Sequence, residues 1–146
     1  MEFRGTVAFA AAQTAVWHTL TTPILVSQCT PRLTGWAALE TENIQFQLHL
    51  AWGNGRNTIL IPMLLTWETV TPPTHLQWHA QAQMGRTTIP LQGDFHLSPA
   101  SSNQTNLAFS AQLTPPNKLL GQMIHTAAPR LIDSFFRCLK SNAEAV

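Results

Sequence analysis

Carboxyl side chains are among the groups that transfer protons in enzymes, and this chain carries seven of them. Hydrolysis by a carboxyl pair needs two such groups on opposite sides of a bond, about 5–10 Å apart. Most of the seven fall at the ends of expected elements or on outward-facing strand positions, and no pair has the spacing for this geometry. We therefore expect no catalytic residue among them. The seven are Glu2, Glu40, Glu42, Glu68, Asp94, Asp133 and Glu144.

Six histidines are candidate metal ligands. His75 and His79 share one face of an expected strand, but four residues of extended chain span about 13 Å, which is too far for both to bind one ion. The sequence contains neither a His-Glu-x-x-His nor a Cys-x-x-Cys motif. His18 and His125 lie in expected helices, where either could face a pocket, although a solvated position is the more common one. We expect no native metal site and no cofactor.

A group of polar residues surrounds the expected strand over residues 89–97. Asp94 and His96 lie on one face of this strand, near Arg86 at its start, and could form a polar cluster with Glu68. The apolar residues of the strand alternate onto its other face, so this cluster is expected to face solvent. The sequence also lacks the Gly-x-Ser-x-Gly motif of serine hydrolases and a Gly-rich phosphate-binding loop.

The chain has two cysteines, Cys29 and Cys138, far apart in the sequence. A structural disulfide is one arrangement, and two free thiols in a cytoplasmic protein are the other. We expect the second. Glu2 and Arg4 precede only a short apolar stretch, which is too short and too acidic for a signal peptide. A cytoplasmic location, at most peripheral to a membrane, is therefore expected.

Composition narrows the classes of partner. Hydrophobic residues make up 45% of the chain, as in a globular protein, but charged residues only 10%, against roughly 25% in an average domain. The net charge is +1 and no run of basic residues occurs, which argues against nucleic acid and against a polybasic membrane anchor. The longest apolar run, residues 59–65, is far shorter than the about 20 residues of a transmembrane helix. Low charge favours self-association, and a homodimer is one expectation.

The spacing of the apolar residues predicts the elements that must position these groups. A strand over residues 1–9 is followed by a short helix over residues 13–22 and by a second short helix that begins at Pro23. Six further strands and one long amphipathic helix complete the chain. These elements cover residues 33–40, 44–52, 57–71, 76–84, 89–97, 107–113 and 117–141. The order predicts one α+β domain over residues 1–146, with a seven-stranded antiparallel sheet curved around the C-terminal helix.

Prolines interrupt three of these elements. Pro62 and Pro90 lie in strands that we expect to be internal, where proline removes a ladder hydrogen bond, so β-bulges are expected there. Pro129 should kink the C-terminal helix or remove one of its hydrogen bonds. Leu60 and Leu64 take outward positions and would form an exposed patch for a partner or a membrane, unless a bulge turns Leu64 inward.

The inward positions combine large aromatic residues with small ones. Such a set can pack into a solid core, but a strongly bent sheet closed by a single helix encloses more volume than the helix fills, so we favour an apolar cavity. The residues expected to line it come from the strands and from the first half of the final helix. They are Phe46, Leu48, Trp52, Trp67, Trp78, Ala80, Leu91, Gly93, Phe95, Phe109, Leu120, Met123, Ile124, Ala127 and Leu131.

Several short segments resemble one protein family. They are Met1-Glu2-Phe3-Arg4-Gly5-Thr6, Phe9-Ala10-Ala11, residues 15–23, Cys29-Thr30-Pro31, Pro72-Pro73, Gly85, residues 93–105, Phe135-Phe136 and Leu139. In order and content they resemble the carbon monoxide dehydrogenase CoxG family, part of the START and birch-pollen-allergen-like (Bet v 1-like, SRPBCC) helix-grip superfamily. The resemblance covers nearly the whole chain, but none of its motifs is catalytic, so it is specific for the fold and not for the function.

This resemblance implies a helix-grip fold with a hydrophobic tunnel. Members of the family are linked to molybdenum hydroxylase systems, to membrane recruitment and to lipid-like molecules such as quinones. Arg32 and Leu33 stand where the family has Gly and Cys, and the chain ends at Val146 without the extension that some members use to reach the membrane. Both departures weaken the specific carbon monoxide dehydrogenase role and leave the cavity expectation intact.

Three functions follow from these observations. The first is a non-catalytic carrier of a hydrophobic small molecule, lipid-like or quinone-like. The second is an accessory protein that docks onto a molybdenum-hydroxylase-type enzyme or a membrane surface. The third is a cyclase or hydrolase, which usually needs polar groups inside the cavity, whereas the inward positions here are almost entirely apolar.

Overall fold

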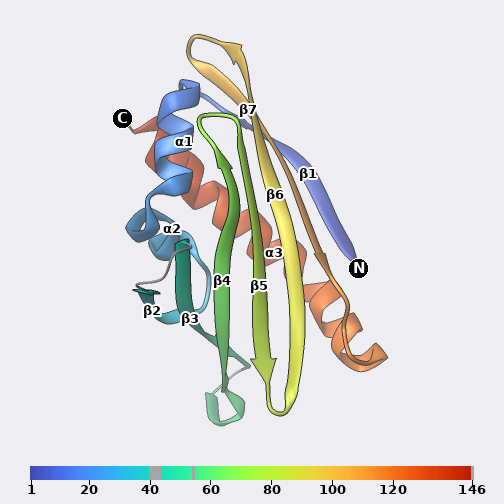
Figure 1. The fold of residues 1–146 in the computed structure, drawn as a ribbon. Coiled ribbons are helices and arrows are strands. Elements are labelled where there is room, and N and C mark those ends of the chain that lie inside the picture. The colour runs from blue at the N-terminus through green and yellow to red at the C-terminus, as the bar shows by residue number, and fades with distance from the viewer. Residues whose placement is uncertain (40–43, 54, 146) are drawn as a thin grey trace.

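The computed structural model describes residues 1–39, 44–53 and 55–145. Its elements, shown in Figure 1, are β1 (Glu2–Phe9), α1 (Gln13–Thr21), α2 (Pro23–Cys29), β2 (Leu33–Leu39), β3 (Ile44–Trp52), a 3-10 turn η1 (Gly55–Asn57), β4 (Ile59–Thr71), β5 (His75–Met84), β6 (Thr87–Ser101), β7 (Gln104–Leu113) and α3 (Lys118–Glu144). The α+β architecture is confirmed. Glu40 at the expected strand end, the carboxyl group of Glu42, and Asn54 in an expected turn lie outside the described residues.

The strands form one antiparallel sheet in the order β1-β7-β6-β5-β4-β3-β2. From β2 to β7 each strand pairs with the next one along the chain, and β1 closes the row by pairing with β7. The helix α3 crosses one face of this curved sheet, and α1 and α2 pack against α3 (Figure 1). Asn117 caps the start of α3, because its side chain accepts a hydrogen bond from the backbone N–H of Leu120 at 2.8 Å.

Two hydrophobic clusters lie between the sheet and α3. The larger one joins α1, the C-terminal half of α3 and β1, β5, β6 and β7, with Phe9, Leu76, Leu107 and Leu139 almost fully buried. The smaller one centres on Ile61, Ala82 and Ile89, in β4, β5 and β6. Since these clusters contain different stretches of the same strands, the interior has two separate regions.

The expected bulges at the two strand prolines do not occur. Pairing of β4 with β5 begins only at Met63, and pairing of β6 with β7 begins only at Leu91. Pro62 and Pro90 therefore each have a paired strand on one side alone, where a missing N–H costs the ladder nothing. Leu64 stays outward, with 36% of its surface exposed, so the alternative in which a bulge turns it inward is wrong.

The cysteines are not free thiols, contrary to the expectation from the sequence. Cys29 and Cys138 form a disulfide between the end of α2 and the last third of α3, with their Cα atoms 5.4 Å apart. The packing of α2 on α3 brings them together, although 109 positions separate them in the sequence. Within α3 the helix continues through Pro129 from Lys118 to Glu144. Among the described residues, no helix combines the length and hydropathy needed to cross a membrane.

Candidate ligand cavity

An apolar cavity of about 310 Å³ lies between the sheet and α3. The sheet contributes inward-facing side chains from β3 to β7, and α3 contributes one turn and a half of its C-terminal half. The helices α1 and α2, with the turn that follows, close one end. Its lining residues are Leu20, Val26, Thr30, Pro31, Leu48, Met63, Leu65, Trp67, Leu76, Trp78, Phe95, Phe109, Ser110, Ala111, Leu131, Ile132, Phe135 and Phe136.

Six of the residues expected to line a cavity stand in this wall. Five of them belong to strands, because alternation along a strand decides which face a side chain takes. The register places them side by side: Trp67 is opposite Trp78 in β4 and β5, and Phe95 is opposite Phe109 in β6 and β7. The six are Leu48, Trp67, Trp78, Phe95, Phe109 and Leu131.

Three further expected residues are neighbours of lining residues but are not in the lining themselves. Phe46 is buried, packs edge-on against Trp67 with ring centroids 5.3 Å apart, and lines a small adjoining hollow of about 70 Å³. Gly93 lies against the indole of Trp78, so that a Cβ at this position would come within 2.6 Å of the indole Cζ2. Ala80 is 1% exposed and lies in β5 beyond the cavity.

The structure places the remaining six expected residues elsewhere. Trp52, Leu91 and Leu120 pack against the smaller hydrophobic cluster. Met123 is 42% exposed, and Ile124 and Ala127 are outside the cavity wall. The reason is the path of α3: its C-terminal half covers the cavity, whereas its first half begins beside the smaller cluster.

Several lining residues were missing from the expected set. In α3 they are Ile132, Phe135 and Phe136. They share the apolar stripe of this helix with Leu131, and that stripe was the sequence pattern that could have identified them. Leu20 in α1 and Val26 in α2 had no such signal, because their place in the wall depends on how these helices pack. The side of the cavity opposite the sheet is therefore built by α1, α2 and α3 together and not by α3 alone.

The chemistry of the wall is almost purely apolar. None of the described residues that line it is titratable. The Thr30 hydroxyl donates to the carbonyl of Val26 at 2.7 Å and is already engaged. The Ser110 hydroxyl donates to the Asp94 carboxylate at 2.8 Å on the outer face of the sheet, so it does not face the cavity. The buried indole N–H of Trp78 has no hydrogen-bond partner among the described residues. The cavity thus offers apolar contact, with no acid or base among its described lining residues.

A second groove adjoins the cavity between β1 and α3, with a volume of about 680 Å³. It shares Phe109, Ile132 and Phe136 with the cavity wall. Its rim is charged, since Arg4 pairs with Glu2 there. We regard the cavity as the ligand site, because its lining is almost entirely apolar, whereas several charged residues line the adjoining groove.

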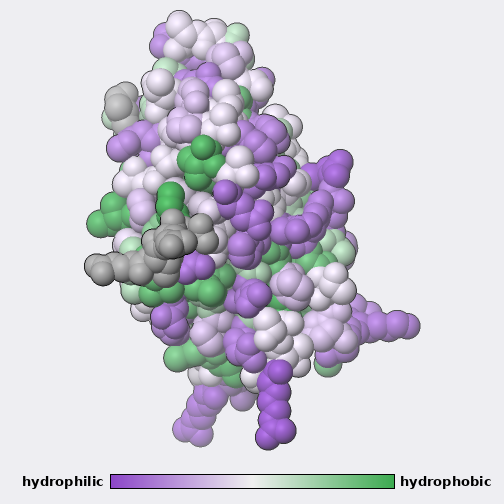
Figure 2. All heavy atoms as spheres, in the orientation of Figure 1, coloured by the Kyte–Doolittle hydropathy of each residue, from purple (hydrophilic) through white to green (hydrophobic). Residues whose placement is uncertain are grey.

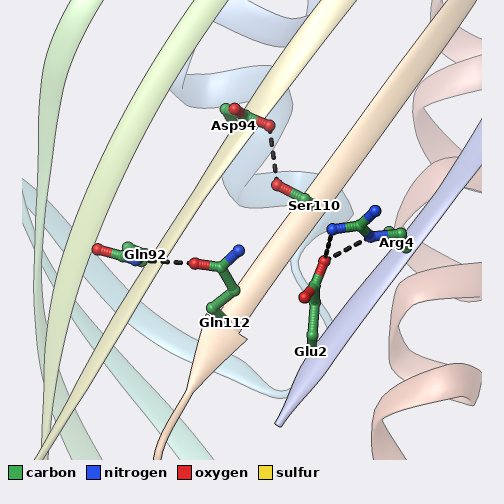
Figure 3. Close-up of polar contacts among 6 residues, drawn as sticks. All are labelled: Glu2, Arg4, Gln92, Asp94, Ser110 and Gln112. Carbon is green, nitrogen blue, oxygen red and sulfur yellow. Dashed lines mark hydrogen bonds and ion pairs between the residues drawn. The ribbon is translucent and has the colours of Figure 1, made fainter.

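On the opposite, outer face of the sheet, hydrophilic residues lie among hydrophobic patches (Figure 2). The polar cluster expected around Asp94 and His96 is present but differs in its members. Glu68 forms an ion pair with His79 instead, and His75 takes its place beside Asp94. Figure 3 shows neighbouring polar pairs across β6 and β7 on this face.

No family model and no curated protein sequence matches this chain. Solved structures do match over nearly its whole length. A conserved protein from Geobacillus kaustophilus is 18% identical, with a TM-score of 0.85 over 98% of this chain and 95% of that chain. The Zhui aromatase/cyclase from Streptomyces sp. R1128 is 13% identical, with a TM-score of 0.76 over 99% and 93%. A START superfamily protein from Mycobacterium smegmatis is 16% identical, with a TM-score of 0.71 over 99% and 97%.

These identities are too low to show a shared activity, and they show the fold. The chain has the helix-grip fold of START superfamily proteins, as its elements predicted. One neighbour is a cyclase, so the fold is compatible both with carrying a ligand and with acting on one. The contents of the cavity must therefore decide between these functions.

Proposed function

We propose that this protein binds a hydrophobic small molecule in the cavity between the sheet and α3 and carries it without chemical change. The observation that supports this is an apolar cavity of about 310 Å³ whose described lining residues include no acid, base or thiol. This volume is at the lower end of the about 300–1,000 Å³ of small-molecule sites. The ligand would be compact, such as a quinone-like ring system or a short lipid-like molecule.

Apolar burial is sufficient for useful affinity. A ligand that loses about 350 Å² of apolar surface gains about 9 kcal/mol before the cost of its lost free motion. A micromolar dissociation constant corresponds to about 8 kcal/mol. Since the lost free motion costs about 4 kcal/mol or more, binding would be weaker than micromolar, with loose selectivity among apolar molecules of similar shape.

Filling the cavity tests this assignment. Leu131→Trp adds a large side chain to the wall of the cavity and should weaken binding of a hydrophobic fluorescent probe, such as an anilinonaphthalene sulfonate, by about tenfold or more. Met123→Trp is the matched control, because this residue lies in the same helix but is 42% exposed. Probe binding that Leu131→Trp leaves unchanged while both variants keep a native circular dichroism spectrum would contradict the cavity assignment.

The docking function remains the alternative. Leu60 is 64% exposed on the outer side of β4, and Leu64 lies further along the same face. Such a patch suits contact with a partner enzyme, a membrane surface or a second copy of the chain. The proposed membership of the carbon monoxide dehydrogenase CoxG family would favour an enzyme of the molybdenum hydroxylase type.

The cyclase function receives less support. The aromatase/cyclase neighbour shares the fold, but ring closure requires proton transfer, and the described residues that line this cavity offer no group for it. The Cys29–Cys138 disulfide argues against the cytoplasmic location that the sequence led us to expect, because cytoplasmic thiols are normally kept reduced.

A further inference from the structure

Three side chains that can bind a metal ion meet on the outer face of the sheet. His75 lies in β5, and Asp94 and His96 lie in β6. In the register of these strands His75 is directly opposite His96, and Asp94 is two residues before His96 on the same face. A search for ligands along one strand misses this group, because its members come together only across two strands.

The distances within the group suit an ion better than direct hydrogen bonds. The Nε2 atom of His75 is 3.9 Å from Oδ2 of Asp94, and Nε2 of His96 is 3.6 Å from the same oxygen. Hydrogen bonds between such atoms are about 2.7–3.2 Å long. Two bonds to a zinc ion, each about 2.0–2.2 Å long, would span these gaps. All three ligand atoms lie within 4.8 Å of one another.

The carboxylate is already oriented for this role. Ser110 in β7 donates a hydrogen bond from its hydroxyl to Oδ1 of Asp94 at 2.8 Å (Figure 3). The other oxygen, Oδ2, is the one near both histidines. Hydrogen bonds of this kind hold the ligands of natural metal sites in position.

One imidazole, that of His75, has a nitrogen without a hydrogen-bond partner, and the other, that of His96, has room to turn. Nε2 of His75 is buried and has no hydrogen-bond partner among the described residues. The rings of His75 and His96 are stacked, with centroids 3.9 Å apart, so one of them must turn for both nitrogens to face an ion. The side chain of His96 is 54% exposed and can make this turn.

Space and charge around the group also permit a cation. A surface hollow of about 310 Å³, lined in part by Asp94 and His96, leaves room for water on the open side of an ion. Arg4 lines the same hollow, but its charge is paired with Glu2. Among the described residues, the one carboxylate in the group is Asp94.

We propose that His75, Asp94 and His96 form a binding site for a divalent transition-metal ion, and that zinc fits it best. Two imidazoles and one carboxylate are a set that zinc uses, with water in its fourth position. Calcium and magnesium prefer oxygen ligands alone. This site is on the face opposite the cavity, since Leu76 and Phe95, which alternate with its residues, line the cavity from the inside. It does not depend on the proposed function.

Calorimetric titration of the metal-free protein with zinc chloride tests the proposal. We expect one zinc ion per chain and a dissociation constant in the micromolar range. His96→Ala and Asp94→Asn should each weaken binding by about tenfold or more, since each removes a ligand. His79→Ala is the control, because His79 lies on the same face of β5 but pairs with Glu68, and it should leave binding unchanged.

Two further measurements keep the test decisive. Circular dichroism and Tm show whether each variant is folded, and the exposed position of His96 makes His96→Ala the safer one. Cobalt binding, followed by its visible absorption, reports directly on nitrogen and oxygen ligands. Absence of saturable 1:1 zinc binding by the wild-type protein would overturn the proposal. So would zinc affinity that is unchanged in folded His96→Ala and Asp94→Asn, or that His79→Ala reduces equally.

Discussion

Gly93 shows how one residue shapes the cavity. A Cβ at this position would lie 2.4 Å from the carbonyl oxygen of Ser110 and 2.6 Å from the indole of Trp78. No side chain fits there, so the absence of one is what allows the indole of Trp78 to pack against β6 at Gly93. The sequence showed Gly93 as a small inward residue, but its contact with Trp78 depends on the register of β5 and β6, which alternation alone does not specify.

Gly93→Ala should therefore displace Trp78 or separate the strands. We expect a loss of about 1–3 kcal/mol in the free energy of unfolding, as for other overpacked sites, and a shift in tryptophan emission. Urea denaturation followed by fluorescence measures both. Gly35→Ala in β2 is the matched control, because the nearest atom to its added Cβ is 4.0 Å away. Equal stability of the two variants would show that Gly93 is not tightly packed.

At the scale of elements, the strands were more predictable than the helices. Alternation assigned the inward faces of β3 to β7 correctly, since a strand has only two faces. The final helix showed a continuous apolar stripe. This stripe did not reveal that residues 131–136, in the second half of the helix, cover the cavity. The contributions of α1 and α2 could not be predicted, because they depend on packing between segments distant in the sequence.

The disulfide between α2 and α3 holds this arrangement together. Cys29 and Cys138 flank the end of the cavity that Val26 and Phe135 line. Cys29→Ala/Cys138→Ala should lower the free energy of unfolding by about 2–5 kcal/mol, because the crosslink closes a long loop in the unfolded chain. Urea denaturation of the variant should coincide with that of the reduced wild-type protein. Alkylation of both cysteines in denaturant without a reductant would show free thiols and contradict the disulfide.

At the scale of the whole molecule, the order of the elements predicted the fold. The chain has one strand, two short helices, six strands and a long helix, in this order. These elements form a single sheet covered by a helix when β1 pairs with β7 and α3 lies across the sheet, and the structure has this arrangement. The order of the elements also predicted an apolar cavity. It could not reveal the size of this space or the metal-ligand group on the outer face, because both arise from contacts across strands.

The central claim is that the cavity holds a hydrophobic molecule, and native mass spectrometry of the freshly purified protein tests it most directly. We predict a stoichiometric adduct that organic extraction releases and identifies as an apolar molecule. A mass equal to that of the bare chain, together with no binding of quinone or acyl-lipid probes up to the limit of their solubility, would contradict the claim and favour docking onto a partner.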